Sequence, residues 1–264
     1  MMAKMTLEQY IKNPMGKNNA VMSGPLRETI KKQYDIKFHN VLLRENGKID
    51  FRLYKDKAAN TFYIHVKVPS ETCENFYYDV VLKFYSDETL KENGRNLQKY
   101  YVQFYSNDPA FVYTYAHTFL VNDLFIKELA PKMSKEAISN RAVEKNPQDI
   151  SSYSKIIYFA ITFMNERGLS NLLTWAAAEP FDLKKLLSEI EHADSKIASR
   201  QEEGKKYSSR KKIQVDDTTL RNIKRIGLSS SNTNRLVTTT NKTSKVKKIG
   251  PSNSTSFVKK TKKR

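Results

Sequence analysis

Residues 76–85 have the sequence Phe-Tyr-Tyr-Asp-Val-Val-Leu-Lys-Phe-Tyr, which alternates strictly between two sets of side chains. Phe76, Tyr78, Val80, Leu82 and Phe84 form one apolar set, and Asp79 and Lys83 belong to the other. A period of two over eight or more residues is typical of a β-strand with one face in the core. Working outward, residues 49–54, 62–68 and 100–105 show related aromatic or β-branched patterns. The sequence therefore predicts an antiparallel sheet of four to six strands within about residues 38–106.

Two local signals set the expected start of that sheet. Pro25 follows Ser23-Gly24, as at a helix start, and predicts a helix over about Leu26 to Tyr34. Asn46-Gly47 lies between apolar runs, which is the strongest short hairpin signal, and predicts a strand on each side of it.

The pattern becomes helical after Asp108-Pro109. Helical spacing and breakers predict a helical segment over about 109–204, ending in one helix that Asp182 caps. The apolar positions of that last helix include Leu183, Leu186, Leu187, Ile190, Ala193 and Ile197. Residues 1–204 are thus expected to form one α+β domain, with mainly strands over 37–107 and mainly helices over 108–204.

The positive charge is concentrated at the C-terminal end. The chain has 264 residues and a net charge of +18, of which residues 205–264 carry +16, since they hold 18 basic and 2 acidic residues. Residues 1–204 carry only +2. Because residues 205–264 contain few apolar groups, we expect this C-terminal basic segment to be disordered when free.

Clustered Lys and Arg residues bind phosphates by counterion release, without reading sequence. The C-terminal basic segment is therefore a candidate non-specific site for DNA or RNA; a solubilising role or an acidic protein partner is the alternative. The candidate residues are Lys205, Lys206, Arg210, Lys211, Lys212, Arg221, Lys224, Arg225, Lys245, Lys247, Lys248, Lys259, Lys260, Lys262, Lys263 and Arg264.

Catalytic motifs are missing from the sequence. It contains no P-loop, dinucleotide fingerprint, zinc spacing, EF-hand loop or nucleophile elbow, so we expect no cofactor, no metal and no enzymatic activity. The four histidines, His39, His65, His117 and His192, lie far apart and are assigned to packing or solvated polar roles, and Cys73 lacks an adjacent base. One alternative is a metal-dependent nuclease using acids such as Glu71, Asp79 and Asp87, which would have to converge in one pocket.

A second alternative is a replication accessory protein that stacks single-stranded bases on exposed sheet tyrosines. It would require many of eight tyrosines to lie on one exposed face. These are Tyr54, Tyr63, Tyr77, Tyr78, Tyr85, Tyr100, Tyr101 and Tyr105.

The loop over residues 13–21 is rich in asparagine and contains Gly16 beside Lys17. Backbone N–H groups in such a loop can form an anion-binding nest. The other interpretation is an ordered turn between two short helices.

Three stretches of the chain resemble a family of tailed-bacteriophage proteins: residues 10–21 (YIKNPMGKNNAV), 104–113 (FYSNDPAFVY) and 144–147 (EKNP). The resemblance covers about residues 5–204. It implies a phage setting, with a virion or genome-handling role, and assigns no residue a function.

Taken together, the sequence predicts a non-enzymatic phage structural or assembly protein that contacts nucleic acid and other phage or host proteins. The single cysteine favours a reducing compartment. No apolar run of 18 residues and no secretory leader are present, so we expect no membrane partner and a place in the host cytoplasm or the virion.

Overall fold

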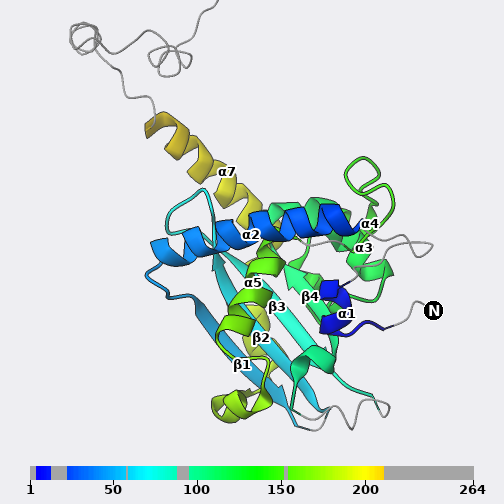
Figure 1. Ribbon diagram of the computed structural model, residues 1–264. Helices are drawn as coiled ribbons and strands as arrows, with labels where there is room; N and C mark the ends of the chain where they lie inside the picture. The colour runs from blue at the N-terminus through cyan, green and yellow to red at the C-terminus, as the bar shows by residue number, and fades with distance from the viewer. Residues whose placement is uncertain (1–3, 13–22, 58, 88–94, 152–153, 211–264) are drawn as a thin grey trace, which may run out of the picture. The chain divides into compact units, whose positions relative to one another are not determined.

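The computed structural model describes residues 4–12, 23–57, 59–87, 95–151 and 154–210 (Figure 1). The helices are α1 (Leu7–Lys12), α2 (Gly24–Arg44), α3 (Ala116–Val121), α4 (Lys135–Ser139), α5 (Lys155–Glu166), α6 (Leu183–Glu189) and α7 (Ala193–Arg210). The strands are β1 (Asp50–Asp56), β2 (Thr61–Pro69), β3 (Tyr77–Tyr85), β4 (Tyr101–Ser106) and β5 (Glu179–Pro180). Short 3-10 turns are η3 (Leu97–Lys99), η5 (Lys127–Lys132) and η6 (Leu172–Ala177), and a π-helical turn is η4 (Phe111–Tyr115). The predicted α+β class is confirmed.

The five strands form one sheet in the order β4-β3-β2-β1-β5. Neighbouring strands from β1 to β4 are antiparallel, as the alternation predicted, and Arg52 lies opposite His65 in the β1–β2 register. β5 pairs with Tyr54 and Lys55 in the parallel direction. The sheet is therefore mixed, and the expectation of a purely antiparallel sheet is wrong, because two residues with no alternation give no sequence signal.

Helix α2 corrects the predicted start of the sheet. It runs through Arg44, so the apolar run before Asn46 is helical and Phe38 and Val41 face the core at a spacing of three. The N–H of Gly47 donates to Leu42 O and that of Asn46 to Leu43 O, with Asn46 at φ 52°. This is the bonding pattern of a Schellman helix end. Asn46-Gly47 thus ends a helix instead of turning a hairpin.

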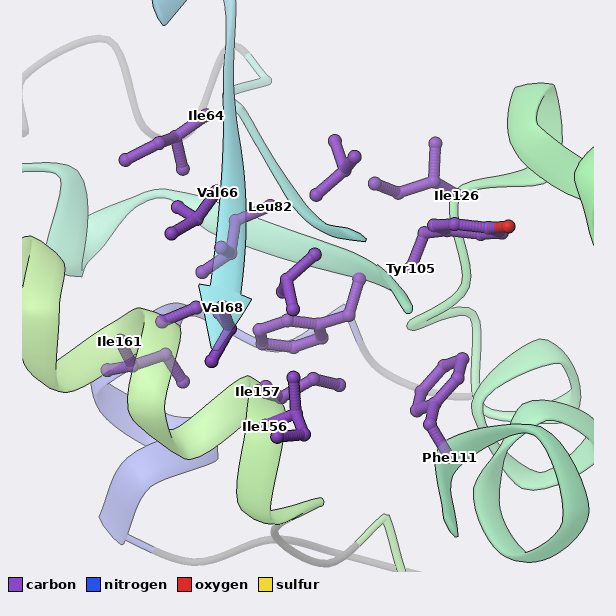
Figure 2. Close-up of a cluster of buried hydrophobic side chains, with 14 of the residues drawn as sticks. Ile64, Val66, Val68, Leu82, Tyr105, Phe111, Ile126, Ile156, Ile157 and Ile161 are labelled. Atoms are coloured by element: carbon purple, nitrogen blue, oxygen red, sulfur yellow. The ribbon is translucent and has the colours of Figure 1, made fainter. Parts of the chain in front are cut away.

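The apolar face of the sheet packs against α5 (Figure 2). Ile64, Val66 and Leu82 from the strands meet Ile157 and Ile161 from the helix, and all five are buried. Helix α2 then packs on α5 through Phe38 and Phe159, whose ring centroids are 5.6 Å apart. Burying this many aliphatic and aromatic groups supplies most of the stability of the fold.

The opposite face of the sheet is also covered. Tyr63 stacks on Phe181 at a centroid distance of 4.0 Å, and Tyr105 donates its hydroxyl to Lys132 O at 3.0 Å. Lys83 pairs with Glu128 of η5. This face combines aromatic contacts with hydrogen bonds, and we call it the polar face.

The predicted last helix is two helices. Ile190 ends α6 in an extended conformation and α7 starts at Ala193. α7 then continues through Arg210, so it includes residues 205–210 of the C-terminal basic segment. Residues 211–264 lie outside the described part of the chain.

Candidate functional site

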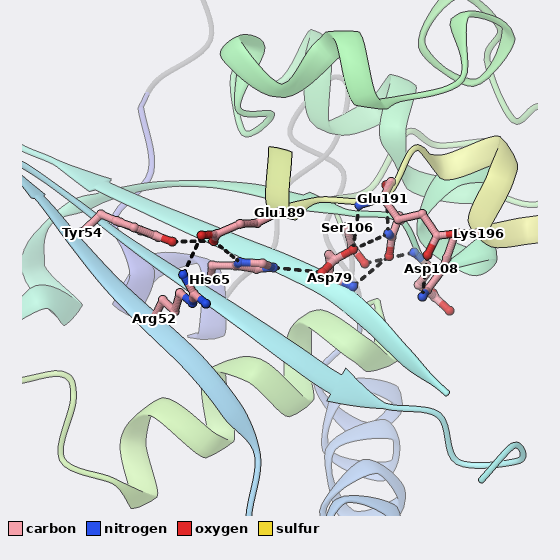
Figure 3. A network of polar contacts seen from close by, with 10 residues as sticks. Arg52, Tyr54, His65, Asp79, Ser106, Asp108, Glu189, Glu191 and Lys196 are labelled. Atoms are coloured by element: carbon pink, nitrogen blue, oxygen red, sulfur yellow. Dashed lines mark hydrogen bonds and ion pairs between the residues drawn. The ribbon is translucent and has the colours of Figure 1, made fainter. Parts of the chain in front are cut away.

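The polar face carries a series of polar contacts centred on His65, which runs from the buried Asp79 to the exposed Arg52 (Figure 3). His65 is 3% exposed, and its Nε2 lies 2.9 Å from Asp79 Oδ1. Since a carboxylate only accepts, Nε2 carries the proton in this bond. His65 Nδ1 lies 3.7 Å from Glu189 Oε2, which also accepts the Tyr54 hydroxyl at 2.6 Å. Arg52 Nη1 donates to Glu189 Oε1 at 2.6 Å.

Asp79 extends this series of polar contacts toward α7. Its Oδ2 accepts Asn107 Nδ2 at 2.8 Å and the backbone N–H of Glu191 at 3.2 Å. Asn107 also accepts the N–H of Asp79 at 2.8 Å and donates to Glu191 O at 3.1 Å. We call Arg52, Tyr54, His65, Asp79, Asn107, Glu189 and Glu191 the polar network.

These side chains meet because alternate residues of a strand point to the same face of the sheet. Arg52 and His65 are opposite in register, and Asp79 lies opposite Lys67, which places it diagonally from His65 on the same face. Glu189 is the last residue of α6, a helix whose start is fixed by Asp182, which accepts the N–H of Lys184 at 2.8 Å. The break between α6 and α7 frees the Glu191 N–H for Asp79.

The titration of Asp79 reflects these contacts. Burial raises the pKa of this carboxyl, but the hydrogen bonds from His65, the Glu191 amide and Asn107 outweigh burial and hold the pKa below its usual value. Asp79 is therefore ionised at neutral pH. A buried carboxylate in this state is stable only with its donors in place.

The geometry favours a positioning role over acid–base catalysis. Both ring nitrogens of His65 face carboxylates, whereas a general base must present a nitrogen to its substrate. The adjacent hollow, lined by Asp50, Phe51, Arg52, His65, Lys67 and Glu189, has a volume of about 80 Å³. Pockets for small-molecule substrates are several times larger, typically ~300–1,000 Å³.

The polar network holds the start of α7. Glu191 also pairs with Lys196 at 2.9 Å, and the Lys196 ammonium lies 4.6 Å from the centre of the Phe76 ring. Arg200 donates to Thr72 Oγ1 at 2.5 Å, and Ala193 and Ile197 are buried. The first two turns of α7 are thus fixed to the sheet and to the β2–β3 loop.

The fixed helix leads directly into the predicted nucleic-acid site. Lys205, Lys206 and Arg210 lie in its last turns. The other thirteen candidate basic residues, from Lys211 to Arg264, lie outside the described residues, as do Gly16 and Lys17 of the candidate anion nest.

A second hollow, of about 310 Å³, lies where α7 passes the start of α5. Asp108, Lys155 and Arg200 are among its lining residues. Burial raises the pKa of Asp108 to about 6, although the carboxylate accepts the N–H of Phe111 at 3.1 Å as a helix cap. The sequence predicted only that a helix begins at Asp108. It did not predict that Asp108 is buried, because its burial depends on residues distant in the sequence.

The acids considered for a nuclease have separate partners. Asp79 belongs to the polar network, Glu71 pairs with Lys155 at 2.7 Å, and Asp87 pairs with Lys4 at 3.5 Å. Within residues 4–12, 23–57, 59–87, 95–151 and 154–210, no group of three His, Cys, Asp or Glu side chains could hold a metal ion.

The sheet tyrosines do not form an exposed stacking surface. Tyr54, Tyr63, Tyr78, Tyr100 and Tyr105 are buried, and Tyr77, Tyr85 and Tyr101 are partly buried. The condition for the single-strand stacking hypothesis is therefore not met. Strand parity places these residues on both faces, and both faces are covered by helices or turns.

The other singled-out residues have local partners. His39 Nδ1 contacts Asp35 O, His117 Nδ1 contacts Ile138 O, and His192 Nδ1 accepts the N–H of Asp194. Cys73 is buried. The sequence did not predict that His65 lies in the polar network. The available signal was that His65 and Arg52 both occupy polar positions in alternating strands.

Among the described residues, no helix combines the length and the apolar character needed to cross a bilayer. Comparison with family models, with curated proteins and with solved structures gives no match for this chain.

Proposed function

We propose that this protein is a non-enzymatic nucleic-acid-binding protein, a structural or assembly component in a phage setting. The observation that carries the proposal is the distribution of charge: +16 in residues 205–264 against +2 in the preceding 204 residues. The body supplies a folded platform, and α7 leads from it into the basic segment.

The polar network supports this division of roles. Partly buried hydrogen bonds and an ion pair fix the first turns of α7 to the sheet, whereas residues 201 and 202 are exposed. A helix held at one end presents its free end at a defined place on the body. The phage setting rests on the sequence resemblance, and detection of the protein in purified virions tests it.

The decisive test for nucleic-acid binding uses three chains: full length, residues 1–211 and residues 1–204. We expect the full chain to bind labelled duplex DNA, single-stranded DNA and RNA with similar affinity. If six to eight phosphates are neutralised, the slope of log K against log salt is about −5 to −7. The 1–211 chain keeps α7 whole and tests Lys205, Lys206, Arg210 and Lys211 alone.

Matched full-length variants control for the deletion. Replacing Lys259, Lys260, Lys262, Lys263 and Arg264 with Gln should weaken binding and make the slope shallower by up to about five. Replacing the four lysines with Arg keeps the charge and should preserve affinity. Equal retention of nucleic acid by the full and 1–204 chains would overturn the proposal.

A further inference from the structure

The two edges of the sheet are protected to different extents. At the β4 edge, Val102 N–H donates to Met5 O, Phe104 N–H to Leu124 O, and Ile126 N–H to Phe104 O. At the β1 edge, β5 pairs with Tyr54 and Lys55. Residues 50–53 of β1 have no strand on their outer side within the described part of the chain.

The pairing of β5 with β1 shows which backbone groups of β1 point away from the sheet. Phe181 N–H donates to Lys55 O, so the backbone of Lys55 faces outward. Because strand residues alternate in direction, the backbone groups of Phe51 and Leu53 also face outward, whereas those of Arg52 face β2. Phe51 is itself 38% exposed. Exposed edge groups of this kind readily pair with another strand.

We propose that this edge pairs with the same edge of a second copy of the chain, antiparallel and centred on Phe51. In this register Phe51 lies opposite the partner's Phe51, and they exchange two hydrogen bonds. The N–H of Leu53 reaches the carbonyl of the partner's Ile49. The two-fold axis repeats that bond, which gives four backbone hydrogen bonds.

The charges on the polar face select this register. Asp50 lies opposite the partner's Arg52, and Arg52 opposite the partner's Asp50, so two ion pairs form. Asp50 is exposed and has no ion pair within the described residues, while the side chain of Arg52 is 46% exposed. Because guanidinium offers five N–H donors, Arg52 can bind Glu189 and the partner's Asp50 together.

Other registers of the same edge are disfavoured. Centring the pair on Arg52 places two arginines opposite each other, and like charges at this position destabilise strand pairing. Centring it on Leu53 requires Lys55, which β5 already occupies. Centring it on Asp50 brings two aspartates together. Of these four registers, only the one centred on Phe51 places Asp50 opposite Arg52.

The length of the free edge also fits this register. Five residues, 49–53, are paired in each copy. At one end Tyr54 already pairs with Glu179 of β5, and at the other the chain turns away at Gly47, where φ is 73°. An interface this short is expected to be weak and transient, in the class that buries less than ~1,200 Å². Two copies would bring two basic segments to one nucleic acid, which strengthens binding through effective concentration.

Disulfide trapping tests the register in the full chain. Hydrogen-bonded antiparallel pairs have Cα atoms about 5.5 Å apart, within the ~4.4–6.8 Å range that a disulfide spans. We expect Phe51→Cys to form a covalent dimer under mild oxidation after nuclease treatment. The matched Leu53→Cys chain should cross-link far less, because Leu53 lies opposite the partner's Ile49. The one native cysteine, Cys73, is buried.

Sedimentation over a concentration series tests the charge pairing. Asp50→Arg should weaken self-association about tenfold or more, since two ion pairs become two repulsions. Glu74→Arg makes the same charge change at an exposed residue of the β2–β3 loop and should leave association unchanged. Equal cross-linking of the two cysteine variants, or self-association of Asp50→Arg at the wild-type level, would overturn the proposal.

Discussion

The two faces of the sheet are stabilised by different kinds of interaction. The face toward α5 is aliphatic and aromatic, and its residues Ile64, Val66 and Leu82 are buried in one cluster with Ile157 and Ile161 (Figure 2). The polar face holds ionised groups that are stable only through specific partners. The difference shows that the first face stabilises the body and the second determines where α7 begins.

The largest effect is expected on the apolar face. Ile157→Ala removes buried methylene and methyl groups and leaves a cavity, so the free energy of unfolding should fall by about 4 kcal/mol. Chemical denaturation measures this change. Ile157→Val should cost only about 1 kcal/mol. A loss below 1 kcal/mol for the alanine variant would mean that α5 is not packed as described.

A slightly smaller effect is expected for Asp79→Ala on the polar face. Removing the carboxylate leaves His65, Asn107 and the Glu191 amide without their acceptor, and breaking a buried pair costs about 3 kcal/mol or more. The control is Asp87→Ala, whose half-exposed pair with Lys4 should contribute less than about 1 kcal/mol. A similar loss in the free energy of unfolding for both variants would mean that Asp79 contributes no more than a half-exposed ion pair.

The smallest effect is a pH dependence at Asp108. Its pKa is raised to about 6 in the folded chain, above its ordinary value of 3.8, so the folded state binds the proton more tightly. The stability from this group is present at low pH and is lost as pH rises through about 6. Relative to Asp108→Asn, which keeps a capping oxygen, the wild type should gain about 1 kcal/mol between pH 7 and pH 5. A constant difference across this range would contradict the assignment.

The sequence predicted the elements whose signal is local. The alternation in residues 62–68 and 76–85 gave the strands and also the faces, because strand parity needs no tertiary information. The helix over residues 38–44 was missed, since Asn46-Gly47 serves equally as a hairpin turn and as a helix end. Strand β5 was not predicted because it depends on the open edge of β1. The break at Ile190 was not predicted because it depends on Asp79.

The candidate site was predictable only in part. The basic segment is visible in composition alone, whereas the polar network joins Tyr54 to Glu189, 135 residues away. No spacing rule brings such residues together. The alternation did place Arg52, His65 and Asp79 on one face, so three of the seven network residues were implicit in the strand pattern.

Hydrogen exchange in the Asp79→Ala and Ile157→Ala chains tests the central claim most directly, namely that the polar face fixes the start of α7. We predict that Asp79→Ala loses amide protection first over residues 190–200, while α5 and β2 keep theirs. Ile157→Ala should show the reverse order, with α5 and β2 exchanging faster. Unchanged protection of residues 190–200 in Asp79→Ala, or the same pattern in both variants, would contradict the account.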